Sequence, residues 1–142
     1  GDWAFDKEWK PAPWFGDNTW GRAKVDAFVY IDGQPNARVI DFKTGRYDGN
    51  QETHREQCEL YGAVVLERMP EVETITTELW YLDHGKIDRY EYSEDNITYK
   101  REKLNNRAVA MTEATEFPAK PSTFGCKWCY FGKEKICEDR YE

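Results

Sequence analysis

The strongest constraint on the fold is a predicted β-hairpin over residues 21–43 that carries an acidic residue in each strand. Residues 21–31 and 37–43 have the apolar and β-branched content of strands, and Asp32-Gly33-Gln34-Pro35-Asn36 separates them. Glycine permits positive φ and proline fixes its own φ, so the middle segment predicts a turn. Asp26 lies in the first strand, and Asp41 follows fifteen residues later in the second. The hairpin is expected to bring these carboxylates together at a sheet edge.

Asp41 begins the segment Asp41-Phe42-Lys43-Thr44-Gly45. Alternation along a strand places Asp41 and Lys43 on one face and Phe42 on the other. Mg²⁺ takes oxygen ligands, and one or two protein carboxylates commonly suffice because water and phosphate complete the shell. Asp26, Asp41 and Lys43 therefore suit a divalent cation beside a phosphodiester, with the ammonium next to the attacking water. The alternative is that Asp-x-Lys is an ordinary solvated strand triplet, since short motifs often arise by chance.

A helix is predicted over residues 51–68, because Leu60, Ala63 and Val64 recur at helical spacing. Gln57 and Tyr61 are four residues apart and share one face of this helix. Directly after the acidic hairpin, these side chains are placed to reach a DNA backbone or to organise the site. An amphipathic helix with a half-buried tyrosine is the alternative interpretation.

Taken in order, these segments resemble the RecB-like exonuclease branch of the PD-(D/E)XK nuclease superfamily. That branch has a glycine and an aspartate on one strand, Asp/Glu-x-Lys on the next, and Gln-x-x-x-Tyr on the following helix. The corresponding segments here are Gly21–Asp26, Asp41–Gly45 and Gln57–Tyr61. The resemblance is close over roughly residues 20–65.

The resemblance implies a restriction-endonuclease-like fold and a Mg²⁺- or Mn²⁺-dependent site. The implied metal ligands are Asp26, Asp41 and the carbonyl of Phe42. The implied catalytic residues are Asp26, Asp41, Lys43, Gln57 and Tyr61, with Lys43 positioning the attacking water. The family usually adds a Glu or His from a helix upstream of the first strand, for which only Glu8 is a substitute here. A minimal or N-terminally trimmed variant is therefore expected.

The C-terminal segment contains Cys126-Lys127-Trp128-Cys129 and, eight positions after Cys129, Cys137. A Cys-x-x-Cys spacing lets two thiolates bind one metal from a tight turn, as in zinc and iron–sulfur sites. Several RecB-like nucleases, including AddB-type and CRISPR-associated ones, carry a four-cysteine [4Fe–4S] cluster, and the resemblance implies that Cys126, Cys129 and Cys137 are cofactor ligands. Zinc is the alternative metal. Cys58, the remaining cysteine, is expected to pack as a small buried hydrophobe rather than act as the fourth ligand.

Composition favours an intracellular enzyme. The sequence shows neither an apolar leader nor a membrane-spanning run, so a cytoplasmic location is expected and disulfides are not. The net charge of −7 argues against a protein that coats DNA without specificity. The N-terminal stretch contains Trp3, Trp9, Trp14 and Trp20, which are expected to complete the core, with base stacking by Trp14 or Trp20 as the alternative.

The remaining segments read as scaffold. Alternation predicts strands over residues 73–83 and 86–92 with a turn at His84-Gly85, and a helix follows over residues 95–115 with Ser93 as its N-cap. His54 lies one turn before Cys58 and three residues before Gln57; it is expected to be solvated, with a position at the edge of the site as the alternative. Basic residues on the last helix (Lys100, Arg101, Lys103 and Arg107) are expected to form a solvated face.

The expected fold class is α/β (α+β), with a mixed central sheet flanked by helices and a cysteine-rich C-terminal tail. One nuclease domain is expected over residues 1–142, divided into an arm (1–20), a core (21–117) and a metal-binding tail (118–142). The expected activity is that of an exonuclease on DNA ends or single strands, in recombination, repair, phage replication or CRISPR adaptation, with a possible helicase partner. The alternatives are a non-catalytic DNA-binding module and a zinc-stabilised protein-interaction domain.

Overall fold

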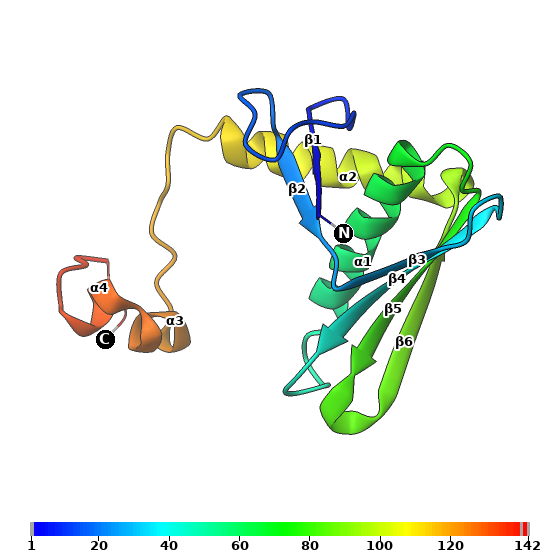
Figure 1. Cartoon of the computed structure of the whole chain (residues 1–142). Coiled ribbons are helices and arrows are strands. Elements are labelled where there is room, and N and C mark those ends of the chain that lie inside the picture. Colours follow the sequence, from blue (N-terminus) through cyan, green and yellow to red (C-terminus); the bar gives the residue numbers. More distant parts are fainter. Residues whose placement is uncertain (1, 140, 142) are drawn as a thin grey trace. The chain divides into compact units, whose positions relative to one another are not determined.

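The computed structural model of the chain describes residues 2–139 and 141, which divide into two compact units at the Arg107–Ala108 boundary. In the described part of the chain, no helix combines the length and the apolar character that crossing a membrane would require. The elements of the first unit, labelled in Figure 1, are β1 (Asp2–Phe5), β2 (Gly21–Lys24), β3 (Ala27–Tyr30), β4 (Asn36–Lys43), α1 (Gln51–Arg68), β5 (Thr74–Tyr81), η1 (Leu82–His84), β6 (Lys86–Tyr92) and most of α2 (Glu94–Thr112).

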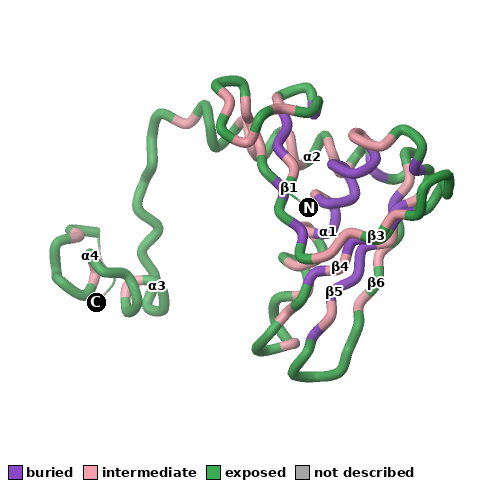
Figure 2. The backbone as a smooth tube through the Cα atoms, in the orientation of Figure 1, coloured by how far each residue is buried: buried purple, intermediate pink, exposed green. Residues whose placement is uncertain are grey.

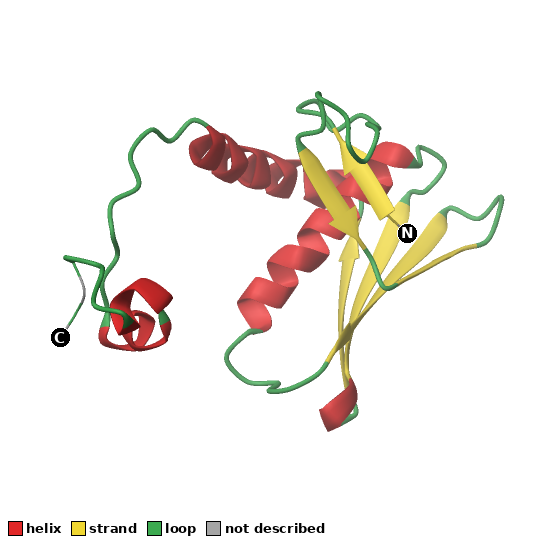
Figure 3. Cartoon of the chain, turned by 60° about the vertical axis from the view of Figure 1, so that its left-hand side comes forward, coloured by secondary structure: helices red, strands yellow, loops and turns green. Residues whose placement is uncertain are grey.

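The main sheet has the strand order β3-β4-β5-β6. The outer pairs β3/β4 and β5/β6 are antiparallel, and the central pair β4/β5 is parallel, with α1 as the connection between its strands. Figures 1 and 3 show α1 lying along one face of this twisted sheet. The expected mixed sheet flanked by helices is therefore confirmed, as is the helix over residues 51–68.

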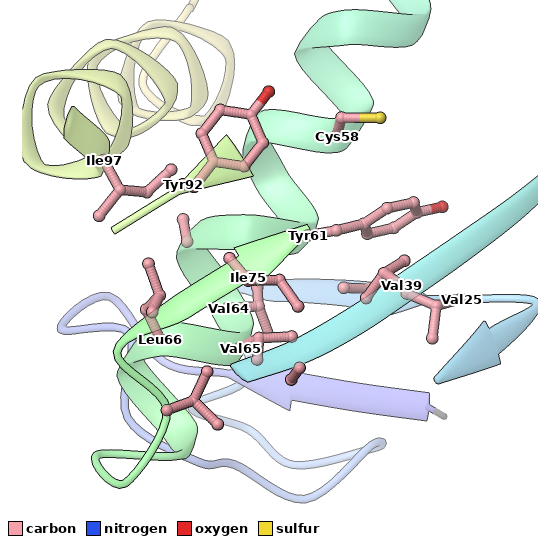
Figure 4. Packing of buried hydrophobic residues seen from close by; sticks show 14 of the residues in the cluster. Val25, Val39, Cys58, Tyr61, Val64, Val65, Leu66, Ile75, Tyr92 and Ile97 are labelled. Atoms are coloured by element: carbon pink, nitrogen blue, oxygen red, sulfur yellow. The ribbon is translucent and has the colours of Figure 1, made fainter. Parts of the chain in front are cut away.

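The core lies between α1 and the sheet. Burial in Figure 2 concentrates on α1 and the central strands, and Figure 4 shows Val64 and Val65 of α1 among Val39 of β4 and Ile75 of β5. Complete burial of one such aliphatic side chain stabilises the fold by about 1.5–3 kcal/mol. Gly62 lets α1 approach β6 closely, because a Cβ at this position would lie 2.7 Å from the Tyr92 ring.

The predicted hairpin is correct in its turn and wrong in its first strand. Gly33 has a φ of +75°, and the amide of Gln34 donates to the carbonyl of Ile31. The predicted strand over residues 21–31, however, is interrupted at Val25 and Asp26. Its first part, β2, pairs with β1 in a separate two-stranded sheet, and its second part, β3, pairs with β4. The interruption arises because the two parts serve different sheets.

The basic residues of α2 form ion pairs, mostly with acidic side chains of α1. Lys100 Nζ lies 2.6 Å from Glu59 Oε1, and Arg107 Nη1 lies 2.7 Å from Glu56 Oε2. Further ion pairs join Lys103 to Glu56 and Arg101 to Glu67 and Glu94. The expected solvated face is thus correct for the exposed Lys103 and Arg107, and the acidic side chains of α1 add ion pairs to it.

Three of the four N-terminal tryptophans pack in the core as expected, and Trp14 does not. Trp9 is buried and stacks on Phe5, while Trp3 and Trp20 pack against the core. In the second unit, α3 (Thr123–Trp128) starts at Ser122, whose side chain accepts a hydrogen bond from the Gly125 amide, and α4 (Tyr130–Lys133) follows. Regular structure stops after Thr112 and resumes at Thr123, in agreement with the prolines between them.

Candidate active site

Four of the five predicted catalytic residues meet around Asp41, near the C-terminal end of β4. Asp41 is buried, and Tyr61 of α1 lies with its hydroxyl 3.1 Å from Asp41 Oδ1. Gln57, one turn earlier on α1, donates from Nε2 to the Tyr61 hydroxyl at 2.5 Å and lies 3.3 Å from Asp41 Oδ1. The prediction that Gln57 and Tyr61 share a helix face is confirmed.

Lys43 completes this group. Its Nζ lies 2.7 Å from Asp41 Oδ2 and donates to Gln57 Oε1 at 2.6 Å. The two side chains of the ion pair are only 18% and 7% exposed, for Lys43 and Asp41 respectively. Asp41 and Lys43 lie on the α1 side of β4, as strand alternation predicts. The ammonium is thus held between a carboxylate and an amide that are both fixed by other contacts.

Asp26 approaches the group from the break between β2 and β3. Its Oδ2 accepts a hydrogen bond of 2.8 Å from the backbone amide of Phe42. Ala27 pairs with Ile40 in the ladder, so a ladder extended by one residue would place Asp26 opposite Asp41. Both acidic residues therefore reach the same end of β4, as the sequence predicts. The Phe42 side chain lies on the other face, packed edge-on against Trp80.

Tyr61 also binds the segment that leads to Asp26. Its hydroxyl lies 3.0 Å from the carbonyl oxygen of Lys24, so it connects α1 with the end of β2. A phenol has one proton, and it can donate to either the Lys24 carbonyl or Asp41 at one time. Burial and the neighbouring Asp41 carboxylate raise the pKa of Tyr61, which keeps the phenol protonated.

His54 is a neighbour of the site that the sequence reading assigned to solvent. Its Nδ1 lies 2.9 Å from the hydroxyl of Tyr81, and its ring is half-buried. Burial and the nearby Lys43 ammonium lower the pKa of His54, which favours the neutral ring at neutral pH. The expectation of a solvated histidine is wrong because its partner on β5 is distant in sequence. Its position one turn before Gln57 was the available signal.

The Asp26–Asp41 pair fits a Mg²⁺-type cation by the chemistry of its donors. Oδ2 of Asp41 is buried and lies 2.7 Å from the Lys43 ammonium, which a divalent cation would displace. Hard divalent cations need one or two such oxygens from the protein. Across residues 2–139 and 141, no three His, Cys, Asp or Glu side chains gather as a metal-binding group.

The C-terminal cysteines do not form a metal-binding group among the described residues. Cys126 and Cys137 are half-buried and Cys129 is exposed, and the Tyr141 amide donates to the Cys126 sulfur at 3.3 Å. Cys126 lies within α3, and Cys129 is the extended residue that follows this helix. Cys58 is buried, as predicted, and burial raises the pKa of its thiol to about 11. The metal site at Cys126, Cys129 and Cys137 therefore stays a prediction.

Comparison with known proteins gives one family. The sequence profile of the PD-(D/E)XK nuclease superfamily matches residues 18–137. Among solved structures, one described as "Crystal structure of SSO0001" is similar, with 22% identity and a TM-score of 0.41 over 85% of this chain. The matched part is 52% of that protein, so this chain spans about half of its length. No curated protein matches the sequence.

Proposed function

Because the chain belongs to the PD-(D/E)XK nuclease superfamily, we propose that it is a Mg²⁺- or Mn²⁺-dependent deoxyribonuclease of the RecB-like branch. Its substrate is DNA at ends or in single strands, cut as an exonuclease would cut it. The observation that supports this best is the arrangement of Lys43, which lies 2.7 Å from a buried carboxylate oxygen of Asp41. Recombination, repair, phage replication and CRISPR adaptation, with or without a helicase partner, are the settings that this activity would serve.

The proposed metal ligands are Asp26, Asp41 and the Phe42 carbonyl. When bound, a divalent cation supplies Lewis-acid activation of water and stabilises the charge that develops on the phosphoryl group. The remaining roles belong to the chain itself. Lys43 holds the attacking water and stabilises the extra negative charge on the phosphate.

Gln57 and Tyr61 position these groups rather than react. Gln57 accepts from Lys43 and donates to Tyr61, and Tyr61 reaches both Asp41 and the Lys24 carbonyl. Each group in this series of hydrogen bonds is held by the next one, so the Lys43 ammonium and the Asp41 carboxylate keep one geometry. Positioning of reacting groups before substrate arrives is the main source of electrostatic catalysis.

Lys43 also acts as an internal counter-ion, which makes a sharp test possible. A divalent cation and the ammonium would both bind the Asp41 carboxylate, so they compete for it. The Lys43→Met variant should therefore bind Mn²⁺ at least as tightly as the wild type and yet release no nucleotides from labelled single-stranded DNA. Asp41→Asn should lose both properties.

Metal binding is measured by thermal unfolding. A ligand at about 100 times its Kd stabilises the folded state by about 2.7 kcal/mol, which raises the melting temperature visibly. Asp32→Asn is the matched control, because Asp32 is exposed in the hairpin turn at the opposite end of β4. Nucleotide release at the wild-type level from both Asp41→Asn and Lys43→Met would remove the enzyme proposal and favour a non-catalytic DNA-binding module.

A metal site at the C-terminal cysteines remains a prediction. The resemblance implies iron–sulfur or zinc, and the described arrangement of Cys126, Cys129 and Cys137 does not assemble such a site. Elemental analysis of protein purified without oxygen tests it. Iron or zinc in stoichiometric amount, lost together with Cys126→Ser and Cys129→Ser, would support a metal site, and its absence from the wild type would contradict one.

A further inference from the structure

The loop between β1 and β2 holds an exposed aromatic side chain in an ordered position. Phe15 of this loop is 88% exposed. The loop itself is well bonded, since the Gly16 amide and the Thr19 hydroxyl both donate to the Pro13 carbonyl and the Thr19 amide donates to Gly16. A single exposed aromatic residue is unremarkable by itself. Phe15 points to a binding site because it lies beside Arg22, the first of a row of exposed charged residues on β2.

Arg22 of β2 fixes the aromatic residues of this loop. Its Nε donates to the Trp14 carbonyl at 2.7 Å. Its guanidinium carbon lies 5.8 Å from the centre of the Trp14 ring and 5.9 Å from that of Phe15. The loop therefore presents two aromatic rings with a positive charge next to them. Nucleobases stack on such rings, and guanidinium groups bind phosphates.

The outer face of β2 continues from Arg22 toward the candidate active site. Exposure alternates along this segment: Arg22, Lys24 and Asp26 are exposed, while Ala23 and Val25 are buried. Successive exposed residues on an extended chain are about 6.6 Å apart, which is comparable with the spacing of phosphates in a stretched single strand. The row thus runs from the aromatic loop through two cations to a proposed metal ligand.

Lys24 is the least engaged member of this row. In the described parts of the chain its ammonium has no ion pair or hydrogen bond, although Asp2 stands opposite it in the β1/β2 register. Its carbonyl, in contrast, is tied to the Tyr61 hydroxyl, so the backbone beneath the ammonium is fixed to the site. A free cation at this position complements a phosphate rather than another protein side chain.

We propose that β2 and the preceding loop bind an unpaired DNA strand and guide it to Asp26 and Asp41. One base stacks on Phe15 and Trp14, and phosphates contact Arg22 and Lys24. This inference rests on the proposed nuclease function and adds to it the path and the single-stranded character of the substrate. Paired bases stack on one another and are not available to Phe15, so a blunt duplex would use the cations alone.

The test is binding of a fluorescent oligothymidine to the Asp41→Asn protein, which is not expected to cut it, at several salt concentrations. Adding Lys24→Gln should weaken binding and reduce the magnitude of the log–log salt slope by about 0.7, the value for one single-strand phosphate contact. Adding Phe15→Ala should weaken binding about fivefold or more without changing the slope, as loss of one stacked base would. For a blunt duplex, Phe15→Ala should have no effect.

Lys7→Gln is the matched control, because Lys7 is an exposed lysine in the turn that follows β1. It should leave affinity and slope unchanged. Binding within twofold of the parent for either Lys24→Gln or Phe15→Ala would overturn the proposed track. The nuclease proposal is judged separately: it fails if the wild-type protein with Mn²⁺ cuts no DNA, and it stands if cutting persists while the track variants bind normally.

Discussion

Replacing Tyr61 by phenylalanine should destabilise the first unit, because the buried hydroxyl connects three elements. Tyr61 is 3% exposed, and its hydroxyl contacts Gln57, Asp41 and the Lys24 carbonyl at 2.5, 3.1 and 3.0 Å. With one proton, the hydroxyl donates one hydrogen bond and accepts another. The substitution keeps the ring and its packing, and it removes these two bonds.

The expected loss follows from the partners that remain. A neutral hydrogen bond contributes about 0.5–1.5 kcal/mol, and one to a charged group such as Asp41 about 1.5–3 kcal/mol. The buried phenol also costs some desolvation, which phenylalanine avoids. The free energy of unfolding should therefore fall by about 1–3 kcal/mol. Nuclease activity should fall as well, because Gln57 loses the contact that orients it toward Lys43.

Urea unfolding in metal-free buffer, followed by tryptophan fluorescence, measures this difference. Trp3, Trp9 and Trp20 report on the first unit, whereas Trp128 is 63% exposed and should contribute a smaller change. Tyr99→Phe is the matched control, since Tyr99 is 76% exposed on α2 and should change stability by less than about 0.5 kcal/mol. A Tyr61→Phe protein as stable as this control would refute the reasoning that the hydroxyl joins the three elements.

Three further predictions concern the surroundings of the site. The pKa of His54 is lower in the folded than in the unfolded chain, so the unfolded chain binds the proton first. The free energy of unfolding should therefore decline as the pH falls below about 6.5. His54→Asn should flatten this decline between about pH 7 and 5. Glu59→Gln should cost about 1–2 kcal/mol in urea unfolding, because Lys100 loses a buried charged partner at 2.6 Å but stays partly solvated. Gly62→Ala should lower the melting temperature, since the added Cβ would lie 2.7 Å from the Tyr92 ring, and overpacking of this kind costs about 1–3 kcal/mol.

Local patterns were sufficient to predict the elements that depend on neighbouring residues. The helix over residues 51–68 was predicted to its observed bounds. The turn at Gly33 and the strand over residues 86–92 also follow from local chemistry. Strand and helix periods also predict that Asp41 shares a face with Lys43 and that Gln57 shares a face with Tyr61. That the two pairs meet was implied by the family resemblance.

Features that depend on distant partners were not predictable in this way. His54 is held by Tyr81, and Glu59 and Glu56 of α1 pair with Lys100 and Arg107 of α2, more than forty positions later. A charge run has the same sequence pattern whether its partners are water or another helix. The cysteine spacing likewise does not indicate whether the thiols converge, because a helical turn and a metal-binding turn share it.

The break at Val25 and Asp26 explains why one strand was predicted over residues 21–31 where the structure has two, and it also places Asp26 near Asp41. Before the break the odd-numbered residues, such as Ala23, are buried, whereas after it Val29 is 49% exposed and Phe28 packs toward the core. The chain therefore turns its inner face over at this point, and both parts remain apolar enough to read as one strand. A continuous strand has a fixed period of two and could not face the small sheet on one side and then the main sheet on the other. Asp26 lies where the ladder of β2 has ended and that of β3 has not begun, which leaves its carboxylate able to reach the Phe42 amide beside Asp41. The interruption that makes the strand prediction wrong is thus the feature that brings Asp26 close to Asp41.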